Sequence, residues 1–344
     1  MPYDIEIINP VDYCGWDDLL ASNPESTFFH TAAWAKVLSE TYNYRPLYFT
    51  IRDDKGLIAL IPMMEVKSIF TGLRGVSLPF TDYCQAIITG RCQLQDMFGF
   101  IKEYGRKCNW KFIEIRGGNY PDETAVSFFY GHRLKLTPNS EQIFSRFDDV
   151  TKRNIRKAIR EGVEVNIHRS IDAVKEFCRL HYITRKKHGL PPQPWSFFEK
   201  IYEHIISKSL GFIAVASYGK IKIAGSVFFN FKEKSLYKFG ASDFKYQHLR
   251  ANNLVMWEAI KLCAQNGHQN FCFGRTEPDN TGLRRFKCGW GTEEQIINYY
   301  KYDLQQNAFV TEAPLVKNSH RRIFGSMPIP LLKIFGSLLY KHMG

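Results

Sequence analysis

Hydrophobic and polar positions alternate along this chain in two rhythms, one with the period of a helix and one with the period of a strand. Apolar residues three and four apart predict a helix over 27–42, because this spacing places them on one helical face. The same spacing predicts helices over 93–108, 147–161, 171–188, 195–208 and 250–266. Runs rich in β-branched and aromatic residues predict strands at 5–8, 46–52, 57–66, 76–89, 112–116, 125–136, 163–168, 212–217, 221–231, 235–241, 270–273 and 296–302.

The order of these elements is similar in the two halves of the chain: helices, then antiparallel strands, then a helix and a last strand. This order predicts an α+β fold with mostly antiparallel sheets and flanking helices, rather than a doubly wound sheet. The sequence Pro138-Asn139-Ser140 marks the expected boundary. We therefore expect a first domain over 1–139, a second over 140–305 and a separate tail over 306–344.

Composition and charge narrow the classes of partner. The chain has 344 residues, 44% of them hydrophobic, which is enough for two cores and excludes a largely disordered chain. The 46 Lys and Arg exceed the 34 Asp and Glu, giving a formal charge of +12. This excess favours anionic partners, namely nucleic acid, phosphate-bearing metabolites or an anionic membrane surface, without choosing among them.

Cysteine usage and the N-terminus predict a cytoplasmic protein. None of the eight cysteines forms a C-x-x-C pair or accompanies a histidine cluster, so we expect a reducing compartment with no disulfide framework and no metal. The first residues contain neither a basic segment nor a long apolar run, and thus do not indicate a signal peptide.

A basic helix is expected over 151–160. Lys152, Arg156 and Arg160 follow one another at four-residue spacing, with Arg153 and Lys157 beside them. Ile155, Ala158 and Ile159 form a separate stripe that we expect to face the core. Such a concentration of cations without acidic partners suits phosphate binding, although a solvated helix face has the same pattern.

The segment 273–291 carries the most chemical information. An apolar strand ends there in a turn with Pro278, Asp279 and Asn280, and a short helix with Arg284, Arg285 and Lys287 follows. Two glycines then flank Trp290. A strand end that leads into a basic helix is a common way to hold an anion or a developing negative charge.

The pattern Gly-Arg-Thr-x-Pro-x-Asn-x-Gly-Leu-x-x-Phe-Lys-x-x-Trp-Gly over 274–291 resembles a signature of the Fem-type transferases, which form peptidoglycan bridges. The run Arg-Asn-Ile-Arg-Lys-Ala over 153–158 is similar to the start of that family's second domain. The resemblance implies two GNAT-like domains and transfer of an aminoacyl or acyl group to an amine of a peptidoglycan precursor or related glycan. It also implies no permanently bound cofactor, with aminoacyl-tRNA or acyl-CoA as co-substrate.

The resemblance further assigns roles to individual residues. It makes Phe286 and Lys287 the catalytic pair, with Lys287 stabilising the tetrahedral oxyanion and Phe286 excluding water; the alternative is a core phenylalanine beside a surface lysine. It places Lys36, two residues after Trp34, on the phosphates of the acceptor, and Tyr237 near the acceptor. Either Arg185 or Lys187 matches a phosphate-binding arginine. The remaining expected substrate-binding residues are Trp34, Lys152, Arg153, Arg156, Arg275 and Arg285.

Two departures from known patterns keep other functions open. Arg116-Gly117 stands where some Fem ligases have Asp-Pro near the acceptor. The turn 246–252 has no glycine, whereas ordinary GNAT enzymes hold the pyrophosphate of CoA with a glycine-containing turn at this place. The alternatives are an acyl-CoA-dependent N-acetyltransferase in polysaccharide or lipid modification, and a non-catalytic binder of anionic ligands.

The tail differs from the rest of the chain, because no Asp or Glu follows residue 318. Arg321, Arg322, Lys333 and Lys341 alternate with apolar residues, and Pro328 and Pro330 open a helical segment. A short cationic amphipathic helix suits an anionic membrane surface, so residues 321–342 predict peripheral contact with the inner face of the cytoplasmic membrane. The alternative is a helix docked on the protein.

Overall fold

The structure is a computed structural model that describes residues 4–54, 56–89, 94–118, 120, 123–311 and 319–344. The chain divides into two compact units, each formed from segments distant in the sequence. Unit 1 comprises Met1–Phe129, Ile296–Leu315 and Leu339–Gly344, and unit 2 comprises Tyr130–Gln295 and Val316–Leu338. The expected boundary at 138–140 lies between a strand and a helix of unit 2.

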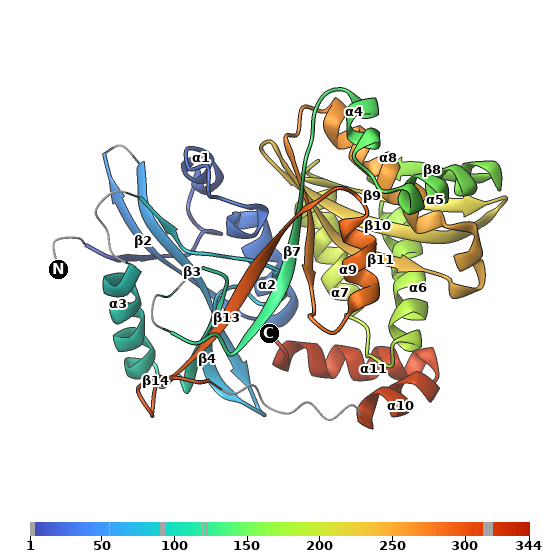
Figure 1. The fold of residues 1–344 in the computed structure, drawn as a ribbon. Coiled ribbons are helices and arrows are strands. Elements are labelled where there is room, and N and C mark those ends of the chain that lie inside the picture. The colour runs from blue at the N-terminus through green and yellow to red at the C-terminus, as the bar shows by residue number, and fades with distance from the viewer. Residues whose placement is uncertain (1–3, 55, 90–93, 119, 121–122, 312–318) are drawn as a thin grey trace. The chain divides into compact units, whose positions relative to one another are not determined.

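Unit 1 is a sheet with helices packed against it (Figure 1). Its strands lie in the order β1 (Glu6–Ile8), β2 (Arg45–Asp53), β3 (Gly56–Ser68), β4 (Gly72–Val76), β6 (Phe112–Arg116) and β13 (Glu293–Asp303), with β5 (Ile87–Ile88) and β14 (Ala308–Phe309) paired at the side. Only the β4–β6 pair is parallel among these strands as described. The helices are α1 (Trp16–Ala21), η1 (Phe28–His30), α2 (Ala32–Tyr42) and α3 (Leu94–Lys107).

In unit 2, the strands form a sheet with helices on both faces (Figure 1). The strand order is β7 (Ser127–Lys135), β12 (Asn270–Thr276), β11 (Lys234–Ser242), β10 (Ile221–Phe231), β9 (Gly211–Tyr218) and β8 (Val163–His168). The β11–β12 pair is parallel and the other neighbours are antiparallel. The helices are α4 (Ser140–Ser145), α5 (Asp149–Arg160), α6 (Ile171–Lys187), α7 (Trp195–Ile201), η2 (Tyr202–Ile206), η3 (Phe244–Leu249), α8 (Ala251–Gln265) and α9 (Thr281–Cys288).

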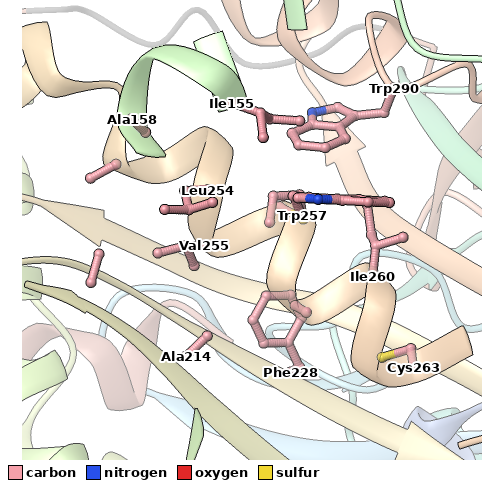
Figure 2. Close-up of a cluster of buried hydrophobic side chains, with 14 of the residues drawn as sticks. Ile155, Ala158, Ala214, Phe228, Leu254, Val255, Trp257, Ile260, Cys263 and Trp290 are labelled. Carbon is pink, nitrogen blue, oxygen red and sulfur yellow. The ribbon is translucent and has the colours of Figure 1, made fainter. Parts of the chain in front are cut away.

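The core of unit 2 is continuous from α5 through α8 to the sheet (Figure 2). Ten of the fifteen residues of α8 are buried, which explains why its apolar positions extend around most of the helix. Trp257 of α8 and Trp290 meet the ring of Phe147 at 5.4 and 5.0 Å. Trp290 therefore joins the segment after α9 to the main core.

The tail forms α10 (Ser319–Ser326), α11 (Ile329–Leu339) and η4 (Tyr340–His342). Of the expected tail over 306–344, residues 312–318 lie outside the described residues. Among the residues that the structure describes, no helix combines the length and the apolar character needed to cross a membrane.

Most of the expected elements are confirmed, including α+β units with mostly antiparallel sheets, but two predictions are wrong. Of the strand expected over 76–89, only Val76 at the end of β4 and the two residues of β5 are strand, because Leu78 and Phe80, on either side of Pro79, have φ of 50° and 59° and turn the chain away. Ile159 does not face the core with Ile155 and Ala158 but is 57% exposed on the last turn of α5. The short helices α1 and α4 were not predicted.

Candidate functional site

A cavity of about 410 Å³ opens in unit 2 where three helices begin. The first turns of α5, α8 and α9 contribute Thr151, Asn252 and Gly282 to its wall. The first N–H groups of a helix have no partner within the helix and carry a partial positive charge. Three such helix ends around one cavity favour an anionic ligand.

The start of α8 is the least capped of the three helix ends. The 3₁₀ turn η3 leads to Arg250, whose φ of 59° reverses the chain as a glycine would. No side chain caps α8, so its first amide groups face the cavity wall without a side-chain acceptor. The turn that lacks glycine thus reaches the needed backbone conformation through Arg250.

The acidic side chains of the cavity wall are used in capping. Asp148 Oδ1 accepts from the Thr151 N–H at 2.6 Å at the start of α5. Asp243 Oδ1 accepts from the Lys245 N–H at 3.0 Å at the start of η3. The formal charges of Arg250 and Arg285 balance those of these two carboxylates, which leaves the partial positive charges of the helix ends in excess at the cavity.

The three cations of α9 point to three different environments. Arg285 is exposed and lines the cavity. Arg284 donates from Nε and Nη2 to the carboxylate of Glu294 at 2.8 and 2.7 Å, and its guanidinium stacks over the Tyr130 ring at 3.7 Å. Lys287 is only 3% exposed, and its Nζ donates to the carbonyl oxygen of Arg275 on β12 at 2.7 Å.

Lys287 and Phe286 point to different surroundings from neighbouring positions of α9. Phe286 lines the cavity and packs edge-on against Trp290 at 5.9 Å, while Lys287 faces β12. Lys287 is thus not a surface lysine. Lys287 also affects its neighbour His132. The burial of His132 is the largest cause, and the nearby ammonium of Lys287 the second, that lowers the pKa of His132 to about 4.

Strands β11 and β12 part beside this region. Their pairing ends at Leu236 opposite Cys272, and Tyr237 is the next residue. On the other side of β11, Tyr237 and Phe239 pair with successive residues of β10, so Lys238 bulges out of the ladder. Burial raises the pKa of Tyr237 to about 12, so its hydroxyl remains protonated beside Gly240 at neutral pH.

A cluster of three side chains that the sequence did not single out lies next to α9. The Nδ1 of His132, the Sγ of Cys288 and Oε2 of Glu294 are 3.7 to 3.9 Å apart. This spacing could hold a metal, but Arg284 binds both oxygens of Glu294 and Lys287 adds a further charge. The cluster is therefore a buried, neutral histidine beside the ion pair of Arg284 and Glu294.

The expected cations of α5 lie away from the cavity. Asp148, Val150, Thr151 and Asn154 form the cavity-facing side of this helix and its cap. Lys152 Nζ instead donates to the Ser145 carbonyl oxygen at 2.9 Å, and Arg156 lies over the Phe144 ring at 5.6 Å. Arg153 is exposed. Phosphate binding by these cations stays a prediction.

The other expected site residues are dispersed. Arg185 donates from Nε to the Pro191 carbonyl oxygen at 3.1 Å, and Lys187 lies 3.5 Å from the centre of the Phe244 ring, on the turn before α8. In unit 1, Trp34 is fully buried against Phe29, and Lys36 is half-buried on the same helix, α2. Their assigned contacts with substrate also stay predictions.

Some functional candidates were missed because their role depends on backbone geometry. Arg250 gave no signal as a residue type, since its importance comes from a positive φ. Thr276 ends β12 fully buried, and its Oγ1 has no hydrogen-bond partner among the described residues. In contrast, the start of α5 could have been predicted, because an aspartate three residues before Thr151 is a common N-cap pattern.

Comparisons with known proteins agree with this architecture. The family model for the GNAT acetyltransferase domain matches residues 145–293, which include the whole cavity wall. The search of curated proteins found no match. Within unit 2, residues 145–293 thus match a GNAT acetyltransferase domain, and this match supports an N-acyltransferase as the class of protein.

Solved structures extend the similarity to most of the chain. FemX is 14% identical with a TM-score of 0.65, covering 88% of this chain and 98% of its own. A tandem GNAT protein from the clavulanic acid biosynthesis pathway is 8% identical with a TM-score of 0.52, over 88% and 99%. A domain described as the C-terminal part of a lysylphosphatidylglycerol synthetase from Agrobacterium fabrum is 11% identical with a TM-score of 0.51, over 85% and 90%. The expected Fem-type, tandem GNAT fold is therefore confirmed.

Proposed function

We propose that this protein transfers an aminoacyl or acyl group from a phosphate-bearing donor to an amine of a cell-wall precursor or related glycan, forming an amide. The observation that carries the proposal is the cavity at the uncapped start of α8, next to the point where β11 and β12 part. The fold shared with FemX supports the aminoacyl version.

Each group of residues has a separate role in this proposal. The helix ends with Arg250 and Arg285 hold the phosphates of the donor, which is aminoacyl-tRNA or acyl-CoA. Phe286 covers the apolar side of the cavity. The acceptor amine attacks the donor carbonyl directly, and Lys287 and the backbone at the parted strands stabilise the oxyanion. The C–O or C–S bond of the donor then breaks, and the proton lost by the amine passes to the departing oxygen or sulfur, which leaves as an alcohol or thiol.

A specific observation favours a second candidate, acyl-CoA-dependent acylation in polysaccharide or lipid modification. The turn before α8 has no glycine, but Arg250 adopts the positive φ that a glycine would supply. The backbone conformation of a glycine-containing turn is therefore preserved. The third possibility, a non-catalytic binder of anions, uses the same charge without turnover.

A thermal-shift experiment separates these functions, with UDP-linked muramyl pentapeptide and acetyl-CoA tested side by side. A ligand at about 100 times its Kd adds about 2.7 kcal/mol to the stability of the protein that binds it. A shift with the muramyl nucleotide supports cell-wall aminoacyl transfer. A shift with acetyl-CoA alone supports the second candidate, acyl-CoA-dependent acylation, in place of the first. A shift with neither ligand contradicts both transfer reactions.

A further inference from the structure

The tail helix α11 is fixed to unit 2 by one face. Leu332 is 1% exposed, and Gly336 packs so closely on the Pro192 carbonyl oxygen that no Cβ would fit. Lys333 lies over the Tyr182 ring of α6 at 5.0 Å, and Gly189 leaves no room beside the backbone of Arg321. These contacts fix the rotation of α11 about its axis, so its other face remains turned outward.

The outward face of α11 is apolar. Leu331, Ile334, Phe335 and Leu338 are 48, 55, 41 and 57% exposed, and their spacing places them in one stripe along the helix. We call these four residues the apolar stripe. Exposed large side chains that adjoin one another in this way indicate an interaction surface, unlike single scattered ones.

The surroundings of the apolar stripe are cationic. Residues 319–344 contain Arg321, Arg322, Lys333 and Lys341 and no Asp or Glu. Helix α10 packs on α6, whose last turn adds Arg185, Lys186 and Lys187. Burial, followed by Lys187, Arg185 and Arg321, lowers the pKa of His188, which agrees with a positive local potential.

We propose that α10 and α11 dock this protein on an anionic phospholipid surface, with the apolar stripe inserted among the lipids and the surrounding cations on the headgroups. A nucleic acid would use the cations but not the stripe, and a protein partner would have to match a tail whose residues 319–344 contain no Asp or Glu. Helix α11 has 11 residues and rises about 16 Å, which suits a helix lying along the interface. This inference does not depend on the proposed function.

In unit 1, a second exposed apolar site adjoins the chain end. Ile69 and Phe70, in the turn between β3 and β4, are 80 and 66% exposed, and the Phe70 ring lies 5.2 Å from the ring of His342. Met343 beside it is 53% exposed. We infer that this turn makes a weaker lipid contact of its own, carried by unit 1.

Vesicle flotation of the full chain tests the proposal. Vesicles of phosphatidylcholine alone are compared with vesicles in which about one third of the lipid is phosphatidylglycerol, at about 0.1 M and about 1 M salt. We expect at least roughly thirtyfold tighter binding to the anionic vesicles at low salt, with most of this difference lost at high salt. Equal binding to both kinds of vesicle, or to neither, would overturn the proposal.

Three variants locate the contact. The triple variant Leu331→Gln, Ile334→Gln and Leu338→Gln should weaken binding to anionic vesicles at least roughly tenfold. Ile159→Gln, which changes an equally exposed isoleucine on the basic helix α5, is the matched control and should bind as wild type. The pair Arg321→Gln and Arg322→Gln should lose roughly 20- to 30-fold on anionic vesicles and nothing on neutral ones.

Circular dichroism and Tm establish that each variant is folded, and light scattering reports self-association. A folded triple variant that floats like wild type would overturn the proposal. So would a triple variant whose only change is loss of self-association, because the stripe would then bind a second copy of the chain. Ile69→Gln with Phe70→Gln should reduce anionic-vesicle binding by a smaller factor than the triple variant, and a larger loss would move the docking surface to unit 1.

Discussion

At the scale of single residues, the site depends on where three neighbouring cations point. Arg284 is held by Glu294 and Tyr130, Arg285 lines the cavity, and Lys287 is buried on β12. The sequence shows three basic residues in one short helix. Their separation follows from the helical rotation of about 100° per residue.

Replacing Lys287 by Met should raise the pKa of His132 above its value of about 4, because the ammonium is the second-largest cause that lowers it. Burial, the largest cause, remains, so the pKa should stay below 6.5. NMR titration of the histidine ring measures this directly.

If Lys287 also stabilises the oxyanion, kcat/KM of the Lys287→Met variant should fall about 10²–10³-fold, with Lys287→Arg retaining part of the activity. An unchanged titration of His132 would contradict the placement of Lys287.

Arg250 combines a charge with an uncommon backbone conformation, and two substitutions separate these properties. Arg250→Gly should leave stability unchanged or slightly improved, because glycine adopts a φ of 59° without steric cost. Arg250→Val should destabilise the protein by at least about 1–2 kcal/mol, since a branched side chain is strained there. Urea unfolding monitored by tryptophan fluorescence measures both. Equal stabilities of the two variants would show that the turn before α8 is not held in this conformation.

At the scale of elements, the segment 289–291 connects α9 to α5. Gly291 has a φ of 68°, and a Cβ on it would lie 2.7 Å from the Arg146 carbonyl oxygen just before α5. Trp290 between the glycines is fully buried in the main core. The two glycines of the signature therefore serve packing between helices.

Gly291→Ala should cost about 1–3 kcal/mol of stability, from the positive φ and the contact with Arg146. Gly282→Ala in the first turn of α9 is the matched control, since nothing lies within 4 Å of its added Cβ. This change should stabilise α9 by about 0.5–1 kcal/mol. Denaturant unfolding of both variants gives the comparison, and a loss at Gly282 equal to that at Gly291 would refute the packing argument.

Two buried histidines should make unit 2 sensitive to acid. Burial lowers the pKa of His132 to about 4 and that of His181 to about 3, from 6.5. Because the unfolded chain takes up these protons more readily, stability is full above about pH 6.5 and falls as the pH drops toward 4. Urea midpoints between pH 7 and 5 measure the slope, above the range where most carboxylates titrate. His132→Asn should flatten this slope, and an unchanged slope would contradict the neutral, buried state of His132.

The sequence predicted best the helices and strands whose periodicity and end residues are visible in the segment itself. The strand Phe112–Arg116, the strand Val163–His168 and α8 were correct or nearly so, because periodicity and glycine or asparagine stops define them. The strand expected over 76–89 was wrong because two residues with positive φ interrupt an apolar run, and nothing in their residue types requires that conformation.

The site was less predictable than the fold for a similar reason. Periodicity and the basic run identified α5 and α9, but not which of their side chains face the cavity. The lack of glycine in the turn 246–252 suggested a poor anion site, whereas Arg250 supplies the same backbone geometry. Patterns of residue type report which helix is basic, while the contacts of each cation come from tertiary packing.

At the scale of the whole molecule, a net charge of +12 is distributed among separate features. Within unit 2, the cavity draws its positive potential from helix ends and two arginines, and the tail presents cations around an apolar stripe. These features predict two distinct salt dependences, one for the donor and one for lipid surfaces. The catalytic proposal and the docking proposal can therefore fail independently.

Calorimetric titration of donors into wild type and into the double variant Arg250→Gly with Arg285→Gln tests the central claim most directly. Acetyl-CoA and an aminoacylated tRNA acceptor stem are the two donors to compare. The account predicts that wild type binds one of them and that the double variant, folded as judged by its Tm, binds it at least roughly tenfold more weakly, as expected for lost charge-assisted contacts to phosphate. Wild-type affinity in the double variant, or no binding of either donor by wild type, would contradict a phosphate-bearing donor in this cavity.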